Sequence, residues 1–435
     1  MAENKNVRRA ALDILMRMEK GDGGDGYSNR LIDTAISKYS FEGADRALLS
    51  RLVSGVTERR ITLDHIIQKF SKMPLGKLDF DALCLLRMGI YQLRYLDRIP
   101  PHAAINETVA LARTRSRGFI NAILRSYLRA GEIKLPAKPD SERLSVAYSA
   151  PRELCEKFIS IFGVEKTECI LASYLEAPAL TLRVNTLKIT RDELILKLQS
   201  EGFECAPTET SPYGVRVIGS GLPSAISEGL AYVQDEASQI SSLVLDPREG
   251  DILLDACACP GGKSFSAALL MKNKGSITSC DLHASKLPLI SSGAERLGIS
   301  IIKTEERDSA KPVTSERGKD TKIICDVPCS GLGVAAKKTE IKYRSLEVNA
   351  ELPPLQYSIL CAVSESLAEG GTLVYSTCTI LPEENENIVS RFLSEHPEFE
   401  AVPFALGKHN APEGKLTLLP NSEHDGFFIS KFRRI

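Results

Sequence analysis

Two cysteines of this sequence stand where buried strands are expected to end. Cys329 follows a proline in "CDVPCSGLGV" (residues 325–334), and Cys378 lies in "VYSTCTI" (residues 374–380). Ligands of open parallel sheets bind outside the carboxyl ends of the strands, and a thiolate placed there can act as a nucleophile. A cysteine is more often a small buried hydrophobe, and we assign that role to seven of the eleven cysteines.

A thiol in this position suits covalent chemistry on a pyrimidine base. The aromatic carbon-5 of cytosine is a poor nucleophile, but addition of a thiolate to carbon-6 turns the ring into an enamine that attacks a methyl donor. An unperturbed thiol has a pKa of about 8.5, so the site must activate it. Asp326, beside the proline-cysteine turn, is placed to hydrogen-bond the amino group and ring nitrogen of the base. The chemistry alone leaves open which of the two thiols attacks.

A glycine turn follows another expected strand in "LLDACACPGGKS" (residues 253–264). Gly261 and Gly262 allow a ligand close to the backbone, and the start of the next helix favours an anionic group. A nucleoside-triphosphate loop would need glycine where this chain has Cys257, and the dinucleotide pattern G-x-G-x-x-G is also absent from this turn. The sequence therefore disfavours both a nucleoside triphosphate and a dinucleotide as the ligand of this turn.

Aspartates recur at the ends of the strands that follow the glycine turn. Asp281 is placed to hold ribose hydroxyls, and Asp308 to accept from an adenine amino group. Any single aspartate of this kind is usually a helix cap or turn residue, so the argument rests on the recurrence. The pattern favours an adenosine cofactor with a carboxylate in place of phosphates, such as S-adenosylmethionine. We expect no metal, because Cys257 and Cys259 lack the second close cysteine pair of a structural zinc site.

The order of the expected elements indicates three regions. Amphipathic helical periodicity fills about the first 135 residues, with tandem prolines at 100–101 ending one segment, and "GEIKLPAKPDSE" (residues 131–142) reads as a linker. A mixed strand-helix-strand region extends to about residue 240 and predicts a small α+β unit. From about residue 245, short apolar strands alternate with helices, which predicts a mainly parallel sheet covered on both faces, closed by "HDGFFISKFRRI".

Composition is that of a multidomain globular protein. The 435 residues are 43% hydrophobic and 26% charged, with a net charge of -1. No apolar run suits a membrane span, the start lacks a signal-peptide core, and the irregular cysteine spacing favours reduced thiols, so we expect a cytoplasmic protein. Residues 1–140 carry 24 Lys and Arg against 16 Asp and Glu, and the rest of the chain carries 31 against 40. Five arginines at positions 113–129, with no acid between them, fit either a polyanion partner or a solvated helix face.

The motifs "DACACPGGKS", "CDVPCSGLG" and "YSTCTILPEENE", in this order and spacing, resemble the RNA cytosine-5 methyltransferases of the Sun/RsmB family. "LRVNTLK" and "YVQDEASQI" resemble that family's pre-catalytic segment, and "DRALLSRLVSGVTERR", "LLRMGIYQL" and "RGFINAILR" its NusB-like helical domain. The resemblance implies an all-α NusB-like domain over residues 1–138, a small α+β domain over 139–242, and an α/β Rossmann-like methyltransferase domain over 243–435.

The resemblance also implies roles for individual residues. Cys378 is the expected nucleophile and Cys329 the thiol that assists release. Asp326 is expected between cofactor and base, with Lys263 facing the catalytic pocket. The expected cofactor-binding residues are Cys257, Ala258, Cys259, Pro260, Gly261, Gly262, Lys263, Asp281, Asp308 and Asp326. Cys259 departs from the alanine that is common in the family, which leaves the backbone role of the loop intact.

The substrate implied by the resemblance is a specific cytosine of 16S ribosomal RNA, free or in an assembly intermediate, and the basic amino-terminal region agrees with RNA binding. Neither a membrane nor an oligomer is implied. Two alternatives remain at this point: a non-enzymatic RNA-binding antiterminator or ribosome-assembly factor, and methyl transfer to transfer RNA. The intact motifs disfavour the first, and the helical extension disfavours the second.

Overall fold

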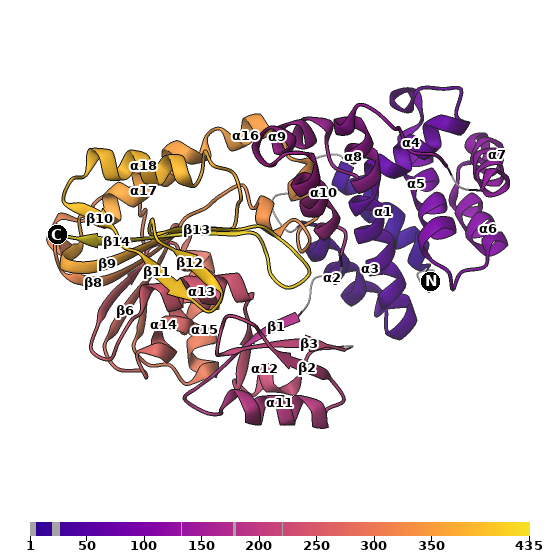
Figure 1. Ribbon diagram of the computed structural model, residues 1–435. Coiled ribbons are helices and arrows are strands. Elements are labelled where there is room, and N and C mark those ends of the chain that lie inside the picture. Colours follow the sequence, from indigo (N-terminus) through magenta and orange to yellow (C-terminus); the bar gives the residue numbers. More distant parts are fainter. Residues whose placement is uncertain (1–5, 20–26, 132, 177–179, 220) are drawn as a thin grey trace. The chain divides into compact units, whose positions relative to one another are not determined.

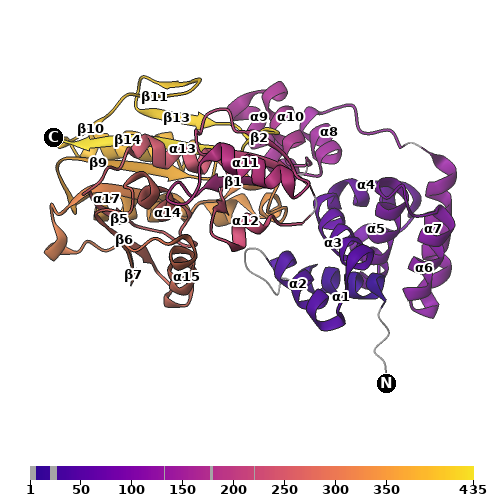
Figure 2. The ribbon, with the colours of Figure 1, turned by 90° about the horizontal axis from the view of Figure 1, so that it is seen from below.

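The computed structural model describes residues 6–19, 27–131, 133–176, 180–219 and 221–435 (Figures 1 and 2). The chain divides into two compact units. A helical unit comprises residues 1–175 together with Ala335–Arg344, and a sheet unit comprises Glu176–Val334 and Ser345–Ile435. The segment 335–344 therefore leaves the sheet unit, packs within the helical unit and returns.

The helical unit consists of amphipathic helices, as the periodicity predicts. Its apolar stripes meet in one continuous core that extends from Val7 in the first helix to Tyr127 in the seventh. The helices are α1 (Val7–Glu19), α2 (Tyr27–Tyr39), α3 (Gly43–Glu58), α4 (Arg60–Phe70), α5 (Phe80–Tyr95), α6 (Pro101–Leu111), α7 (Thr114–Ala130), α8 (Asp140–Tyr148), α9 (Arg152–Phe162) and α10 (Val164–Ser173), with the 3-10 turns η1 (Leu75–Lys77) and η5 (Ile341–Tyr343).

Two boundaries in this unit differ from the sequence pattern. Residues 44–70 carry a single helical periodicity, but Arg59, at φ −103° and ψ 15°, separates α3 from α4. The expected linker is shorter than its composition suggests, because α8 begins at Asp140 with acids in its first turn. Glu132, in the same linker, lies outside the described residues.

The sheet unit begins with a small antiparallel sheet in the order β2-β3-β1-β4. Apolar residues on one face of this sheet, such as Leu182 and Val215, pack with Leu194 and Leu198 of α11, and the helix starts with a capping box between Thr190 and Glu193. The elements are β1 (Leu180–Val184), α11 (Arg191–Ser200), β2 (Glu204–Pro207), β3 (Gly214–Ile218), α12 (Ser224–Ser227) and β4 (Ala231–Val233).

The main sheet has the order β10-β14-β9-β8-β5-β6-β7, with β13 pairing β14. Neighbours from β9 to β7 are parallel, whereas β14 is antiparallel to β9, β10 and β13. The strands are β5 (Ile252–Asp255), β6 (Ser276–Asp281), β7 (Ile302–Glu306), β8 (Asp320–Asp326), β9 (Leu367–Thr377), β10 (Phe399–Ala401), β13 (Lys415–Leu418) and β14 (Phe427–Arg434), and β11 (Phe404–Leu406) pairs β12 (His409–Ala411).

Helices cover both faces of the main sheet, which confirms the predicted α/β architecture. Alternate residues of one strand point to opposite cores: Leu253 packs in the core with α13, α14 and α15, and Leu254 in the core with α17 and α18. The remaining helices and turns are α13 (Glu236–Leu245), α14 (Gly262–Leu270), η2 (Ala284–Lys286), α15 (Leu287–Leu297), η3 (Thr314–Glu316), η4 (Leu332–Val334), α16 (Leu346–Asn349), α17 (Leu352–Ser364) and α18 (Glu386–Glu395). Within the described ranges, no helix is both long and apolar enough to cross a membrane.

Candidate active site

The two thiols singled out in the sequence lie together at the carboxyl edge of the main sheet. Strands β8 and β9 run parallel and side by side, with Asp326 opposite Ser376. Cys329 follows β8 by three residues and Cys378 follows β9 directly. Their sulfur atoms are 3.3 Å apart. Two segments far apart in the sequence therefore form a single thiol pair.

A buried carboxylate connects the loops that carry the thiols. Glu384, 1% exposed, accepts from the backbone N–H and the hydroxyl of Ser330 at 2.9 and 2.5 Å. Gln356 of α17 donates to Glu384 at 2.8 Å and to the carbonyl of Pro328 at 3.0 Å. The hydroxyls of Ser330 and Thr379 are 2.8 Å apart. Because the Cys329 loop is held on both sides of its cysteine and is bonded to the Cys378 loop at Thr379, the thiols have little freedom to separate.

Gly333 brings the two thiol loops into direct backbone contact. Its N–H donates to the carbonyl of Cys378 at 2.9 Å, and its own carbonyl accepts from Gly426 at 2.8 Å. A Cβ atom at position 333 would lie 2.0 Å from the carbonyl oxygen of Gly426 and 2.8 Å from that of Cys378. Only glycine fits this crossing, because backbone atoms surround it.

The surroundings of Cys329 keep this thiol protonated. The hydrogen bond with Cys378, together with burial and the nearby charges of Glu384 and Asp326, holds the pKa of Cys329 well above its usual range. Two thiolates 3.3 Å apart would repel each other, so the pair retains at least one proton.

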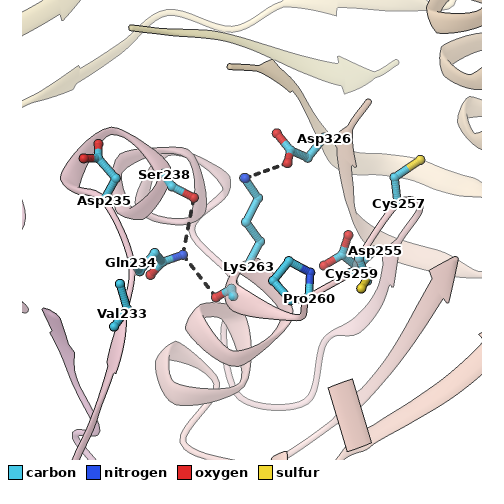
Figure 3. Close-up of a pocket in the computed structure, with 12 residues that line it drawn as sticks. Val233, Gln234, Asp235, Ser238, Asp255, Cys257, Cys259, Pro260, Lys263 and Asp326 are labelled. Carbon is cyan, nitrogen blue, oxygen red and sulfur yellow. Dashed lines mark hydrogen bonds and ion pairs between the residues drawn. The ribbon is translucent and has the colours of Figure 1, made fainter. Parts of the chain in front are cut away.

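The glycine turn is built between β5 and α14. Gly261 has a φ of +108° and lies against Phe265, where a Cβ would be 2.5 Å from the ring. The N–H of Ala258 donates to the carbonyl of Cys280 at 2.7 Å, which holds the turn against the end of β6. The turn exposes its backbone to a cavity of about 200 Å³ (Figure 3).

Lys263 and Asp326 form an ion pair across this cavity. The ammonium lies 2.7 Å from Oδ2 of Asp326, and the hydroxyl of Ser376 donates to Oδ1 at 2.7 Å. Figure 3 shows Lys263 reaching from the start of α14 to Asp326, with Gln234 and Ser238 on one side and Asp255 on the other. The pair presents one fixed cation and one fixed carboxylate to a ligand.

Asp255 is the most unusual ionisable group of the cavity. It is 0% exposed, its Oδ2 accepts from the hydroxyl of Ser264 at 2.6 Å, and its Oδ1 makes no hydrogen bond of good geometry with any residue in the described ranges. Burial raises the pKa of this carboxyl to about 7, against the opposing effects of Ser264 and Lys263. A buried oxygen without a partner beside a cavity is a point where a ligand donor would be stabilised.

The structure brings most of the predicted cofactor residues to this cavity. It is lined by Val233, Gln234, Asp235, Ser238, Asp255, Cys257, Ala258, Cys259, Pro260, Gly262, Lys263 and Asp326. Gly261 belongs to the same turn. Cys329 and Cys378 are not among the lining residues, although Cys329 follows Asp326 by three positions.

Two predicted residues lie along the same sheet edge but outside the cavity lining. Asp281 ends β6, accepts from the N–H of His283 at 2.9 Å and lies 3.6 Å from the ammonium of Lys286. Asp308 does not end its strand as expected, because β7 stops at Glu306, and it pairs with Lys311 at 2.9 Å. Both carboxylates are thus already engaged by neighbours in their own loops.

The sequence interpretation missed one wall of the cavity. This wall is formed where β4 leads into α13, by Val233, Gln234, Asp235 and Ser238. Asp235 caps α13 by accepting from the N–H of Ala237 at 3.0 Å, and it also accepts from the N–H of Asp425 at 3.2 Å. The only signal was the stretch "YVQDEASQI", whose cap and strand pattern indicate a local structure and not a ligand. Asp255 ends β5, and an aspartate at a strand end does not by itself indicate a role.

The basic stretch at 113–129 is less free than the sequence suggests. Acids from another segment lie against it: Arg113 pairs with Asp81 at 2.9 Å and Arg115 with Asp79 at 2.8 Å. The arginine side chains remain about two-thirds exposed. In the part of the chain that the structure describes, no group of three or more His, Cys, Asp or Glu side chains is arranged to hold a metal ion.

Comparison with known proteins gives matches along the whole chain. Family models match residues 5–129 (NusB family), 150–221 (RsmF/B-like methyltransferase, ferredoxin-like domain) and 242–433 (16S rRNA methyltransferase RsmB/F). The chain is 37% identical to the probable ribosomal RNA small subunit methyltransferase B of Bacillus subtilis, over 99% of both chains. It is 31% identical to ribosomal RNA small subunit methyltransferase B of Pseudomonas syringae, over 99% of this chain and 97% of that one.

Solved structures agree with these matches. The crystal structure of PH0851 has a TM-score of 0.81 at 27% identity and covers 100% of both chains. A structure of NSun6 from Pyrococcus horikoshii has a TM-score of 0.58 at 25% identity, over 65% of this chain and 98% of that one. The fold and the matches together define an α/β methyltransferase that carries a NusB-like helical domain and a ferredoxin-like domain. The chain belongs to the ribosomal RNA small subunit methyltransferase B family, and it is an rRNA methyltransferase.

Proposed function

We propose that this enzyme methylates carbon-5 of a specific cytosine in 16S rRNA, with S-adenosylmethionine as methyl donor. Cys378 attacks carbon-6 of the base, and Cys329 assists release of the methylated product. The observation that carries this proposal is the thiol pair, with sulfurs 3.3 Å apart and the pKa of Cys329 raised. Such a pair places a nucleophile and a proton carrier on the same base.

The resting pair favours Cys378 as the nucleophile. A thiolate attacks and a protonated thiol does not, and the raised pKa of Cys329 keeps that residue a thiol. Attack forms a bond from the sulfur of Cys378 to carbon-6 and makes carbon-5 an enamine carbon. Asp326, fixed by Lys263 and Ser376, is positioned to accept from the amino group of the cytosine and so to orient the ring for attack.

Release of the methylated base depends on the same contact between the two sulfur atoms. The hydrogen bond that raises the pKa of Cys329 comes from Cys378, and that interaction weakens once the sulfur of Cys378 is bonded to carbon. Cys329 then loses its proton to water and its thiolate takes the proton from carbon-5. The electron pair of that C–H bond expels Cys378 as a thiolate. The thiol pair returns to its starting state, with one proton released for each methyl group added.

The polar groups that line the cavity suit S-adenosylmethionine. The unpartnered Oδ1 of Asp255 suits a cationic or N–H donor, and the cavity lacks a phosphate-binding glycine pattern. In this proposal residues 257–263 hold the cofactor, with Asp281 at its ribose and Asp308 at its adenine. The bound cofactor supplies an electrophilic methyl group. The structure of NSun6 was solved with SFG, an analogue of S-adenosylmethionine, which supports the same choice here.

We base the proposed RNA substrate on the family to which the chain belongs. The helical part, residues 1–138, and the small α+β part, residues 139–242, would present rRNA to the catalytic part, residues 243–435. Exposed arginines of α7 supply phosphate contacts, and the target base must be single-stranded or flipped out to reach the thiols. The substrate is free rRNA or an assembly intermediate, which implies a cytoplasmic enzyme.

The test is transfer of labelled methyl groups to unmodified 16S rRNA, with denaturing gels to detect protein–RNA adducts. Cys378→Ala is expected to be inactive and to form no adduct, whereas Cys329→Ala accumulates a covalent complex. Cys169→Ala, an exposed thiol of α10 outside the site, is the matched control and should behave as wild type. An adduct in Cys378→Ala would exchange the two roles, and transfer to tRNA but not to rRNA would overturn the substrate.

A further inference from the structure

Segment 335–344 belongs to the helical unit, although it begins directly after the motif that contains Cys329. Ala335 comes two residues after Gly333, and Ala335–Arg344 is compact with residues 1–175 and not with the sheet unit. The 3-10 turn η5 (Ile341–Tyr343) anchors this segment. No sequence motif predicts that residues 335–344 pack with the helical unit.

Lys342 is the first anchor. Its side chain is buried, with 1% of the residue exposed. The ammonium donates to the carbonyl of Glu58 at 2.9 Å and to that of Tyr148 at 3.4 Å. These carbonyls end α3 and α8, where the backbone oxygens of a helix lack intrahelical partners and carry partial negative charge. Two helix ends therefore converge on one cation.

Tyr343 is the second anchor. Its hydroxyl donates to the carbonyl of Glu58 at 3.0 Å and lies 2.8 Å from the hydroxyl of Ser149. The guanidinium of Arg60 covers its ring at 4.1 Å from the centroid. The hydroxyl of Ser149 also accepts from the N–H of Ile61 at 2.9 Å, which ties α8 to α4. The anchors thus contact three helices of the unit's interior.

The amino-terminal end of the segment is joined through Val334 to the loop that carries Cys329. Gly333 hydrogen-bonds to the carbonyl of Cys378 and to Gly426 and has no room for a side chain. Only Val334 separates it from the segment. A displacement of Ala335 therefore acts through the backbone on Gly333, whose contacts with Cys378 and Gly426 leave no space for Gly333 to shift.

We propose that segment 335–344 is a tether through which the helical unit positions the release thiol, with Lys342 and Tyr343 as positioning residues. The inference rests on the proposed release role of Cys329. It gives the helical unit a role in each turnover besides RNA binding, because a shift of the Cys329 loop by a fraction of an ångström is enough to slow proton transfer from carbon-5.

The chemistry of the anchor supports a positioning role over a purely structural one. Burial lowers the pKa of Lys342 to about 7, so the charged anchor costs stability that an apolar side chain of the same length would not. The cation fixes the orientation of segment 335–344, because its two acceptors lie at fixed helix ends.

The experiment compares Lys342→Met with Lys338→Met, an exposed lysine of the same segment, in the full-length enzyme. Single-turnover methyl transfer, steady-state kcat and KM for rRNA, and adduct lifetime are measured for each. Lys342→Met should keep the single-turnover rate and KM, lower kcat about tenfold and prolong the adduct, because a misplacement of about 1 Å costs one to two orders of magnitude. Lys338→Met should match wild type, and Lys342→Arg, which keeps the cation, should recover kcat.

Tyr343→Phe, which removes a single hydroxyl, provides the same test if Lys342→Met does not fold. Equal kcat and adduct lifetime in wild type and the anchor variants would overturn the tether, as would a loss of single-turnover rate in proportion to kcat, which indicates a structural role alone. The Cys329→Ala reference separates the two hypotheses. If it traps no adduct, the proposed function fails whatever the anchor variants do.

Discussion

Replacing Asp255 by Asn should stabilise the ligand-free protein at neutral pH and remove part of its pH dependence. The carboxyl is fully buried, and burial raises its pKa from 3.8 to about 7. The folded state therefore binds this proton more tightly than the unfolded state. Between the two pKa values the unfolded chain ionises and the folded one does not, so stability falls as the pH rises from about 4 to about 7.

The magnitude follows from the two pKa values. One pKa unit corresponds to about 1.4 kcal/mol, so the full shift corresponds to about 4 kcal/mol above pH 7. Between pH 5 and pH 8 the linkage relation gives a loss of about 2.5 kcal/mol for wild type that Asp255→Asn does not suffer. Asparagine keeps an oxygen for the hydroxyl of Ser264, so the hydroxyl need not lose its acceptor.

Urea unfolding of both proteins at pH 5 and pH 8, followed through the transition of the sheet unit, measures this difference. The control is Asp308→Asn, because Asp308 is partly exposed and Lys311 lowers its pKa, so this variant should gain nothing as the pH rises. The stabilised Asp255→Asn should also bind S-adenosylmethionine more weakly. A stability gain of equal size at both pH values would refute the reasoning, since it would owe nothing to the proton.

Other predictions concern packing. Gly333→Ala should destabilise the protein by about 2 kcal/mol or more and lower methyl transfer, because the added Cβ meets backbone atoms. Gly118→Ala, in α7 with open space around it, should instead stabilise the helical unit by about 1 kcal/mol. Thermal unfolding measures both changes. Arg87→Met should destabilise that unit by about 2 kcal/mol, because Arg87 is buried and binds both oxygens of Asp64 and one of Glu19. An unchanged midpoint in Arg87→Met would show that the two partly exposed carboxylates are satisfied by water.

The elements that carry chemistry were predictable because their signals are local. A short apolar run followed by a proline or glycine turn predicts a strand end, and parallel strands place their ends on one edge. Local patterns of this kind are sufficient to place Cys329 and Cys378 at the same edge of the sheet. They could not give the separation of the two thiols, because the order of β8 and β9 in the sheet depends on packing across the whole domain.

The features that escaped prediction depend on long-range contacts. The break at Arg59 interrupts an unbroken helical periodicity, and the acids that face Arg113 and Arg115 come from more than thirty residues upstream. The docking of segment 335–344 has no periodic signature, because two side chains, Lys342 and Tyr343, provide its anchors. A local pattern carries no information on partners at such distances in the chain.

The asymmetry of the thiols shows how structure adds to what chemistry leaves open. From residue types alone either cysteine could attack, because each follows a strand at the same edge. In the structure the hydrogen bond between the sulfurs, burial and the charges of Glu384 and Asp326 raise the pKa of Cys329, which favours Cys378 as the attacking thiol. A single thiol cannot serve as both nucleophile and base on the same ring, since the attacking sulfur is already bonded to carbon when the proton must leave. In the proposed mechanism a second thiol whose pKa depends on the first resolves this, because the bond formed by Cys378 would also release Cys329 to act.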